Sequence, residues 1–200
     1  ILDVGCGIGE FLTICNDQGY ETHGIDISEW AVDVCKKAGL QAEVGTLPNA
    51  EYPRDYFHCV TMWDVVEHLT DPRAHLQSAW EILRPDGWLI VKTPNVSKVL
   101  FLLAAITKRL RSSSKNMEAI LGLPAHILYF NLRSLTELVR SNGFIPRRVV
   151  SMGRMRAKPQ ARTVNGWIYQ SLWSGLSQFG LAGNLLIYAQ KPGKIEVATE

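Results

Sequence analysis

The feature that most constrains this chain is a glycine-rich turn within its first ten residues. Gly5, Gly7 and Gly9 stand at alternate positions between an apolar run at residues 1–4 and a helical pattern that begins at Phe11. Glycine adopts positive φ without strain and, having no Cβ, lets the backbone approach a ligand closely. A strand, a turn of this kind and a helix open a nucleotide-binding crevice in α/β proteins. The opening residues therefore predict an α/β fold with a nucleotide-like ligand at this turn.

Glu10 narrows the choice of nucleotide. The dinucleotide fingerprint G-x-G-x-x-G requires glycine where Glu10 stands. The carboxylate would also share the helix N-terminus with a pyrophosphate, which disfavours an NAD-dependent dehydrogenase. Asp26 ends the next expected strand, residues 22–26, at about the separation at which an acidic residue meets ribose hydroxyls. We therefore expect a ligand that contains ribose but is not a dinucleotide.

These residues together resemble the class I S-adenosylmethionine-dependent methyltransferases. The family's first motif is similar to residues 2–9, LDVGCGIG, and its second motif is similar to residues 24–28, GIDIS. The resemblance covers most of the chain up to about Asn95. It implies a Rossmann-like, doubly wound sheet and S-adenosyl-L-methionine as the cofactor.

Strand and helix patterns alternate through the first half of the chain. After residues 22–26, strands are expected at residues 41–44, 57–62 and 88–92, and helices are expected to begin after Ser28 and Asp71. The residues 84–87, Arg-Pro-Asp-Gly, are expected to form a turn into the last of these strands. Alternation of this kind predicts a parallel sheet with right-handed crossovers, whose ligands bind beyond the carboxyl ends of the strands.

The second half of the chain resembles the family more loosely. A helix capped by Asn131 and strands at residues 144–150 and 185–190 look like the end of small-molecule methyltransferases, in the branch of ubiquinone-biosynthesis O-methyltransferases and glycan-modifying enzymes. This implies seven strands in the order 3-2-1-4-5-7-6, mostly parallel with the last strand antiparallel. Helical insertions are expected at residues 99–106 and 167–176. We expect one N-terminally truncated domain over residues 1–200, with a cofactor half at 1–95 and an acceptor half at 96–200.

The resemblance assigns cofactor roles to residues at the expected strand ends. The backbone of residues 5–9 would receive the carboxylate of the amino acid tail, Asp3 its ammonium group, and Asp26 the two ribose hydroxyls. Thr46 stands where the family usually has an acidic residue near the adenine amine. The full set of expected cofactor contacts is Asp3, Gly5, Cys6, Gly7, Gly9, Asp26, Ile27, Thr46, Leu47, Trp63 and Asp64.

A second group of residues is expected to face the methyl acceptor. Glu67 and His68 belong to the segment WDVVEHL, residues 63–69, which resembles the loop that covers the methionine part of the cofactor and borders the acceptor. His126 resembles a His-x-x-x-Phe element of this branch and is the candidate catalytic base, with Tyr129 beside it. The alternative for His126 is a residue that only caps or packs against the following helix.

The same loop could in principle hold a metal ion. Asp64, Glu67 and His68 are suitable ligand types, but no second ligand cluster in the sequence supports them. The sequence therefore predicts no metal site.

Charge is unevenly distributed along the chain. Residues 1–86 hold fifteen of the nineteen acidic residues but only five of the 21 lysines and arginines, and residues 138–195 contain no acidic residue. One interpretation is pairing across the fold or solvated faces. The other is a positive surface that meets an anionic acceptor or the surface of an anionic membrane. Apolar residues 99–106, followed by Lys108, Arg109 and Arg111, fit either a buried helix or an interfacial segment, and are too short for a transmembrane helix.

Cysteine usage and motifs limit the class of protein further. Cys6, Cys15, Cys35 and Cys59 form no C-x-x-C pair, which is typical of reduced cysteines in a cytoplasmic protein. No Asn/Asp-Pro-Pro-Tyr motif or nucleic-acid module is present, so a nucleic acid partner is not expected. We expect a methyltransferase that acts on an oxygen of a small-molecule, sugar or lipid-linked acceptor. The alternatives are a catalytically inactive cofactor-binding module and an N- or C-methyltransferase of the same fold.

Overall fold

The computed structural model describes residues 1–96, 126–152 and 183–193. The helical insertions expected at residues 99–106 and 167–176 lie outside the described residues, as do Lys108, Arg109 and Arg111. Within the described part of the chain, no helix is long and apolar enough to cross a membrane.

Strands and helices alternate in the first half, as expected. Its elements are β1 (Leu2–Val4), α1 (Glu10–Asp17), β2 (His23–Asp26), α2 (Glu29–Lys37), β3 (Ala42–Val44), the 3₁₀ helix η1 (Leu47–Asn49), β4 (Phe57–Trp63), the 3₁₀ helix η2 (Val66–His68), α3 (Pro72–Ile82) and β5 (Leu83–Pro94). The second half contributes α6 (Leu132–Ser141), β6 (Ile145–Met152) and β7 (Asn184–Gln190).

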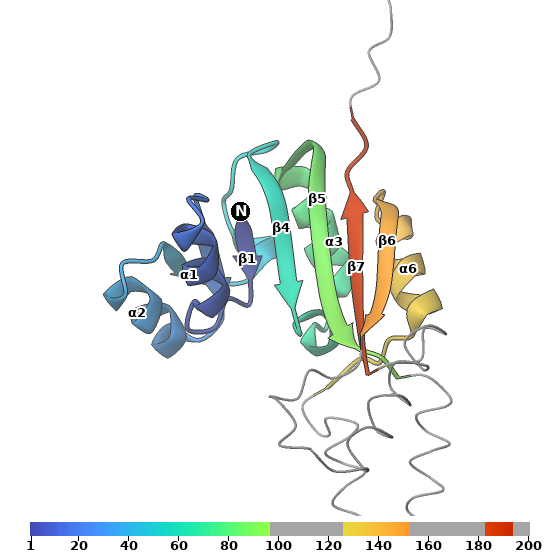
Figure 1. Cartoon of the computed structure of the whole chain (residues 1–200), viewed down its shortest axis with the longest axis horizontal. Helices are drawn as coiled ribbons and strands as arrows, with labels where there is room; N and C mark the ends of the chain where they lie inside the picture. Colours follow the sequence, from blue (N-terminus) through green and yellow to red (C-terminus); the bar gives the residue numbers. More distant parts are fainter. Residues whose placement is uncertain (97–125, 153–182, 194–200) are drawn as a thin grey trace, which may run out of the picture.

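The strands form one seven-stranded sheet in the order β3-β2-β1-β4-β5-β7-β6 (Figure 1). β1 pairs in parallel with β2 and β4, and β4 pairs in parallel with β5. β7 is antiparallel to both of its neighbours, β5 and β6. The expected strand order and the expected antiparallel last strand are both confirmed.

The main core lies on one face of this sheet, beneath α3 and α6. Alternate residues of the central strands point to this face, as the period of two requires, and they include Val60 and Met62 of β4 and Leu89 and Val91 of β5. Leu76 and Ala79 of α3 and Leu135 and Val139 of α6 complete the same cluster. A smaller cluster joins α1 and α2 to the first turn through Cys6, Leu12, Cys35 and Leu40.

Side-chain caps set the starts of three helices. Ser28 accepts a hydrogen bond from the Ala31 amide at 3.3 Å, and Asp71 accepts one from the Ala74 amide at 3.0 Å, ahead of Pro72 at the first helical position. Asn131 forms a reciprocal capping box with Ser134. These caps satisfy amides that a helix N-terminus leaves without partners, and all three were expected from the sequence.

The segment at residues 84–87 differs from the expectation. It was expected to be a turn before a strand at residues 88–92, but β5 already begins at Leu83, which pairs with Phe57. The register then shifts between Phe57 and Cys59, and Asp86 takes a φ of 64°. The turn residues therefore form a bulge inside a longer strand, because Leu83 is fully buried and pairs before the bulge.

Candidate functional site

The glycine turn lies at the carboxyl ends of β1 and β2. Gly5, Gly7 and Gly9 all have positive φ, at 71°, 52° and 83°. A Cβ on Gly5 would lie 2.5 Å from Cγ2 of Val65, so this glycine permits contact with the loop after β4. A Cβ on Gly7 would meet nothing within 4 Å. Gly7 therefore faces open space at the edge of the sheet where ligands of this fold class bind.

Four amides of this turn already have acceptors within the protein. Gly5 and Cys6 donate to the Ile25 carbonyl at 2.7 and 3.2 Å, Gly9 donates to the Cys6 carbonyl, and Gly7 donates to Oδ2 of Asp26 at 2.9 Å. These four hydrogen bonds do not test the expected contact between the backbone of residues 5–9 and the cofactor carboxylate, which stays a prediction. The hydrogen bonds of these amides fix the conformation of the turn. The side chain of Cys6 also packs against α1 and α2.

Asp26 connects the two motifs at the end of β2. Its Oδ2 accepts from the Gly7 amide, and its Oδ1 accepts from the Ser28 amide at 2.8 Å. A carboxylate has about four lone-pair sites, so two remain for a diol. The expected ribose contact is compatible with this geometry, and the same carboxylate also fixes the turn that surrounds it.

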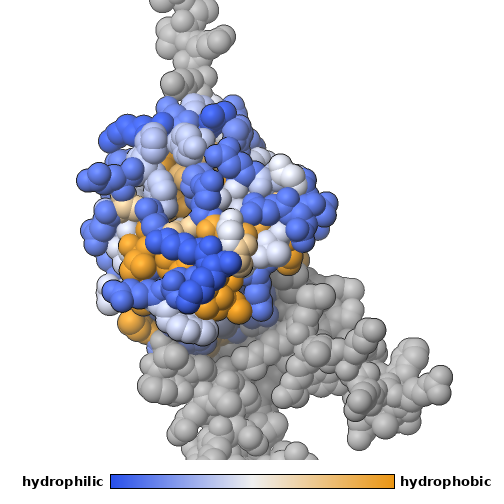
Figure 2. All heavy atoms as spheres, turned by 90° about the vertical axis from the view of Figure 1, so that its left-hand side faces the viewer, coloured by the Kyte–Doolittle hydropathy of each residue, from blue (hydrophilic) through white to orange (hydrophobic). Residues whose placement is uncertain are grey.

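The residues expected near adenine divide into exposed and buried ones. Ile27 is 76% exposed, so its side chain is available to an apolar ring. Thr46 is half-buried directly after Gly45, whose amide donates to the Asp26 carbonyl. Leu47 is 2% exposed and packs in the main core, so the expected contact can involve only its backbone. On the side of α1 and α2, Figure 2 shows hydrophobic side chains among hydrophilic ones.

Asp3 is a buried carboxyl group beside the turn. It is 2% exposed, and Oδ1 accepts a hydrogen bond from the Thr61 hydroxyl at 2.6 Å. Burial raises the pKa of Asp3 to about 7, with Asp26 adding to the rise and the Thr61 hydroxyl opposing it. An arriving ammonium group would favour the ionised form, so Asp3 fits the role that the resemblance gives it.

The loop after β4 follows the same edge of the sheet. The Trp63 ring packs against that of Phe11 of α1, with ring centroids 5.1 Å apart and the ring planes tilted by 58°. The buried Nε1 of Trp63 has no hydrogen-bond partner among the described residues. Asp64 has a φ of 55° and forms an ion pair with Lys92 of β5. Strained backbone of this kind persists where surrounding contacts hold it, as the Lys92 carbonyl does by accepting the Asp64 amide at 2.9 Å.

Glu67 is an unusual buried acid. It is 1% exposed, and its Oε2 accepts a hydrogen bond from the Thr93 hydroxyl at 2.9 Å. Its Oε1 is buried and has no hydrogen-bond partner among the described residues. Burial raises the pKa of Glu67 above its usual value. Leaving a buried acceptor without a partner costs about 1–3 kcal/mol, so this oxygen is a candidate to meet a ligand.

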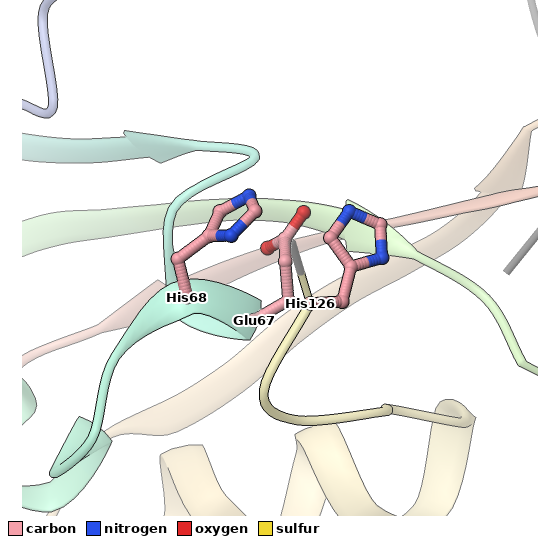
Figure 3. Close-up of side chains that lie close together, drawn as sticks. All are labelled: Glu67, His68 and His126. Carbon is pink, nitrogen blue, oxygen red and sulfur yellow. The ribbon is translucent and has the colours of Figure 1, made fainter. Parts of the chain in front are cut away.

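His126 reaches this loop from a distant part of the sequence. The Glu67 carbonyl accepts hydrogen bonds from the amides of Ile127 and Leu128 at 3.0 and 2.9 Å, and Phe130 bridges to Asn95 at the end of β5. The imidazoles of His126 and His68 consequently lie 4.9 Å apart, with the Glu67 carboxylate between them (Figure 3). The Tyr129 ring lies 6.3 Å from that of His126.

The structure therefore brings together all four residues expected on the acceptor side. Sequence reasoning missed the partners that hold the site, namely Phe11, Val65, Lys92 and Thr93. Two of these carried a signal in the sequence: Val65 lies within the loop expected at residues 63–69, and Lys92 ends the strand expected at residues 88–92.

Comparisons with known proteins identify the family and relatives of this chain. A family model described as a methyltransferase domain matches residues 1–148. The chain is 29% identical over 114 residues to a ubiquinone biosynthesis O-methyltransferase of Leptothrix cholodnii, covering 53% of this chain and 48% of that protein. It is 27% identical over 165 residues to the enzyme of that name in Nitrosomonas europaea, covering 76% of this chain and 66% of that one. The chain thus spans about half the length of the first of these curated relatives.

Solved structures share the fold at low identity. A SAM-dependent methyltransferase from Archaeoglobus fulgidus superposes with a TM-score of 0.63 at 22% identity, covering 95% of this chain and 85% of that one. A Thermotoga maritima methyltransferase, described as a possible histamine N-methyltransferase, superposes with a TM-score of 0.66 at 19% identity, covering 95% and 80%.

Substitution of Gly7 tests whether the cofactor lies against this turn, because its effects on stability and on ligand affinity can be measured separately. Gly7→Ala should destabilise the fold by about 1–2 kcal/mol, the cost of a left-handed conformation for a residue with a Cβ. Because that Cβ enters open space at the turn, affinity for S-adenosylhomocysteine should also fall by about tenfold or more, which is about 1.4 kcal/mol. Calorimetric titration and thermal melting measure the two effects.

Gly39→Ala is the matched control for this substitution. Gly39 has a φ of 78°, and its added Cβ would also meet nothing within 4 Å. It follows the C-terminus of α2, at the opposite end of that helix from Ser28. This variant should lose similar stability and keep the parent's affinity. Equal affinities for the two variants would contradict the assignment of Gly7.

Asp3 predicts two pH effects of opposite sign. Its folded pKa of about 7 exceeds the ordinary value of 3.8, so the native state binds this proton more tightly than the unfolded chain. Between about pH 4 and 7, the ligand-free protein should lose stability relative to Asp3→Asn as pH rises. Affinity for the ammonium-bearing S-adenosylhomocysteine should instead rise through pH 7 in the parent and stay flat in Asp3→Asn. If the affinity for S-adenosylhomocysteine varied with pH in the same way in the parent and in Asp3→Asn, the assignment of Asp3 to the cofactor site would be contradicted.

Proposed function

Because the chain belongs to the class I S-adenosylmethionine-dependent methyltransferases, we propose that it methylates an oxygen atom of a small-molecule, sugar or lipid-linked acceptor. The family match over residues 1–148 includes the turn, the strand ends and the acceptor-side loop. S-adenosyl-L-methionine is the methyl donor of this family. The O-methyltransferase names of the two curated relatives support oxygen as the acceptor atom.

The residues at the turn fit this cofactor. The open space at Gly7 admits a ligand against the backbone, Asp26 retains lone pairs for a diol, and Asp3 is a buried carboxyl group suited to an ammonium group. When bound, the cofactor supplies a methyl carbon that its sulfonium already activates for displacement. The protein's tasks are then to align the acceptor, exclude water and remove the acceptor's proton.

The observation that carries the proposal is the position of His126 beside the loop after β4. Its ring lies 4.9 Å from that of His68 and 6.3 Å from that of Tyr129, beyond the carboxyl ends of β4 and β5. We assign to His126 the removal of the proton from the acceptor hydroxyl, with Tyr129 and His68 bordering the acceptor. His126 is tied to the site through the amides of Ile127 and Leu128, which favours a functional role over simple packing.

The fold alone does not choose the acceptor atom. A structure that superposes on this chain is described as a possible histamine N-methyltransferase, and another is the [4+2]-cyclase SpnF, with a TM-score of 0.65 at 17% identity. Function on such a scaffold depends on the residues of the site. An assay must therefore compare hydroxyl, amine and carbon acceptors, and its failure with every acceptor despite cofactor binding would favour an inactive binding module.

A contact with anionic membranes is the second part of the proposal. It rests on the sequence of the second half, where apolar residues 99–106 precede Lys108, Arg109 and Arg111 and residues 138–195 lack any acid. An apolar surface beside clustered cations binds anionic interfaces. Such a contact would present a lipid-linked acceptor close to the strand ends.

His126→Ala should lower turnover by about 10²–10⁴-fold, the contribution expected of general acid–base catalysis, at little cost in cofactor affinity. Release of S-adenosylhomocysteine across the acceptor panel measures turnover. His75→Ala is the control, because His75 lies on α3 and contacts the Asp71 carbonyl instead of the loop. Turnover within a few-fold of the parent in His126→Ala would reduce His126 to a packing residue.

The membrane proposal predicts co-sedimentation with anionic liposomes, weak binding to neutral ones, and loss of binding at high salt through screening. Replacing Lys108, Arg109 and Arg111 with Gln should weaken binding by about 1 kcal/mol per cation. Replacing Lys36, Lys37 and Arg73, which are exposed on α2 and α3, removes equal charge and should have little effect. Equal sedimentation of parent and both triple variants would refute the role of the basic segment.

A further inference from the structure

We infer that Glu67, His68 and His126 form a binding site for a divalent cation of the zinc class. One potential ligand atom from each of these residues lies within 4.8 Å of the other two. The sequence pattern predicts no metal site, because Asp64, Glu67 and His68 have no second ligand cluster near them in the sequence to support them. The fold supplies the missing ligand from a segment about sixty positions away in the chain.

The composition of the set indicates the type of ion. Two imidazoles and one carboxylate are the ligands of catalytic zinc sites with one open position. Imidazole favours zinc and its transition-metal neighbours, whereas magnesium and calcium prefer sites made of oxygen ligands. Asp64 is a poor candidate for this set because it forms an ion pair with Lys92. The proposed ligands are therefore different from the run of residues that the sequence pattern first suggested.

The buried side chain of Glu67 gives a second, independent indication that an ion binds here. Its carboxylate is buried, and Oε1 has no hydrogen-bond partner among the described residues. The Thr93 hydroxyl donates to Oε2 at 2.9 Å and thereby orients the group. Hydrogen bonding to a ligating carboxylate from a neighbouring side chain is typical of metal sites. A cation at Oε1 would compensate both the missing hydrogen bond and the burial of negative charge.

Backbone contacts hold the ligands in place before any ion arrives. Glu67 and His68 are adjacent in η2, and the Glu67 carbonyl accepts the amides of Ile127 and Leu128, directly after His126. In Figure 3 the carboxylate projects between the two imidazoles, which come from opposite sides. Zinc bonds of about 2.0–2.2 Å require closer ligand atoms than 4.8 Å, so binding needs a small inward movement of the side chains.

Ion binding at this site does not depend on the proposed function. A role of the ion in methyl transfer does rest on the proposed function. An acceptor hydroxyl in the open position would lose its proton to solvent more readily, because a bound divalent ion lowers the pKa of a coordinated oxygen acid. The resulting oxygen anion would then form a bond to the methyl carbon while the bond from that carbon to the sulfonium sulfur breaks, and S-adenosylhomocysteine would leave with the electron pair. In that case His126 would bind the metal ion instead of acting as the base. Its coordinated nitrogen could not accept the proton of the acceptor hydroxyl, which would pass to solvent.

Metal binding is measured first in the absence of any acceptor. The full chain, stripped with a chelator and dialysed, is titrated with ZnCl₂ by calorimetry and with CoCl₂ by visible absorption, with MgCl₂ as comparison. We expect one zinc or cobalt ion per chain, a cobalt d–d spectrum typical of nitrogen and oxygen ligands, and much weaker magnesium binding. The absence of zinc and cobalt uptake by the folded protein would overturn the inference.

Ligand variants identify the site. Glu67→Gln keeps the shape and an acceptor for Thr93, and His68→Ala and His126→Ala truncate the imidazoles. Each should weaken cobalt binding by at least about tenfold and change its spectrum. His75→Ala should bind as the parent does, and all variants should keep their affinity for S-adenosylhomocysteine. Unchanged cobalt affinity in Glu67→Gln and His126→Ala would place the ion elsewhere and contradict the inference.

Turnover with and without chelator separates this inference from the proposed function. Methyl transfer that depends on zinc or cobalt supports both. Methyl transfer that persists in chelator, and still requires His126, would overturn the catalytic part of the inference and retain the proposed base. If the protein bound the ion but transferred no methyl group to any hydroxyl acceptor, the inferred metal site would stand and the proposed function would be refuted.

Discussion

The structure depends on the parallel pairing of β1 with β2 and β4, which brings three carboxyl ends to one edge of the sheet. Each strand end supplies one part of the site: the turn at Gly7, the carboxylate of Asp26 and the loop that contains Glu67. Contacts between these parts then fix them, through the bond from the Gly7 amide to Asp26 and the approach of Val65 to Gly5. The site is therefore a product of strand register.

Two buried carboxyl groups give this edge its chemical character. Asp3 and Glu67 are each no more than 2% exposed, and burial raises the pKa of both. Each also has one hydroxyl donor, from Thr61 and Thr93 on the neighbouring strands. Groups of this kind are costly unless a positive partner arrives. In the proposed function the ammonium of the cofactor is the partner of Asp3, and in the inferred metal site a divalent ion is the partner of Glu67. On these proposals, Asp3 marks the cofactor side of the site and Glu67 marks the acceptor side.

Local signals made much of the fold predictable. The caps at Ser28 and Asn131 and the turn at Gly7 depend on interactions within a few residues, and the sequence displays them directly. The order of the last two strands came from family resemblance, because no local pattern determines it. The bulge after Leu83 and the contact of Glu67 with Ile127 depend on register and on residues far apart in the chain, and they became visible only in the structure.

The most direct test of the account is transfer of a carbon-13 methyl group from labelled S-adenosylmethionine to hydroxylated aromatic, sugar and lipid-linked acceptors, read by carbon-13 NMR. The account predicts a product whose labelled carbon has the chemical shift of a methyl group bound to oxygen. A folded protein that binds S-adenosylhomocysteine but labels only nitrogen or carbon, or no acceptor in the panel, would contradict it.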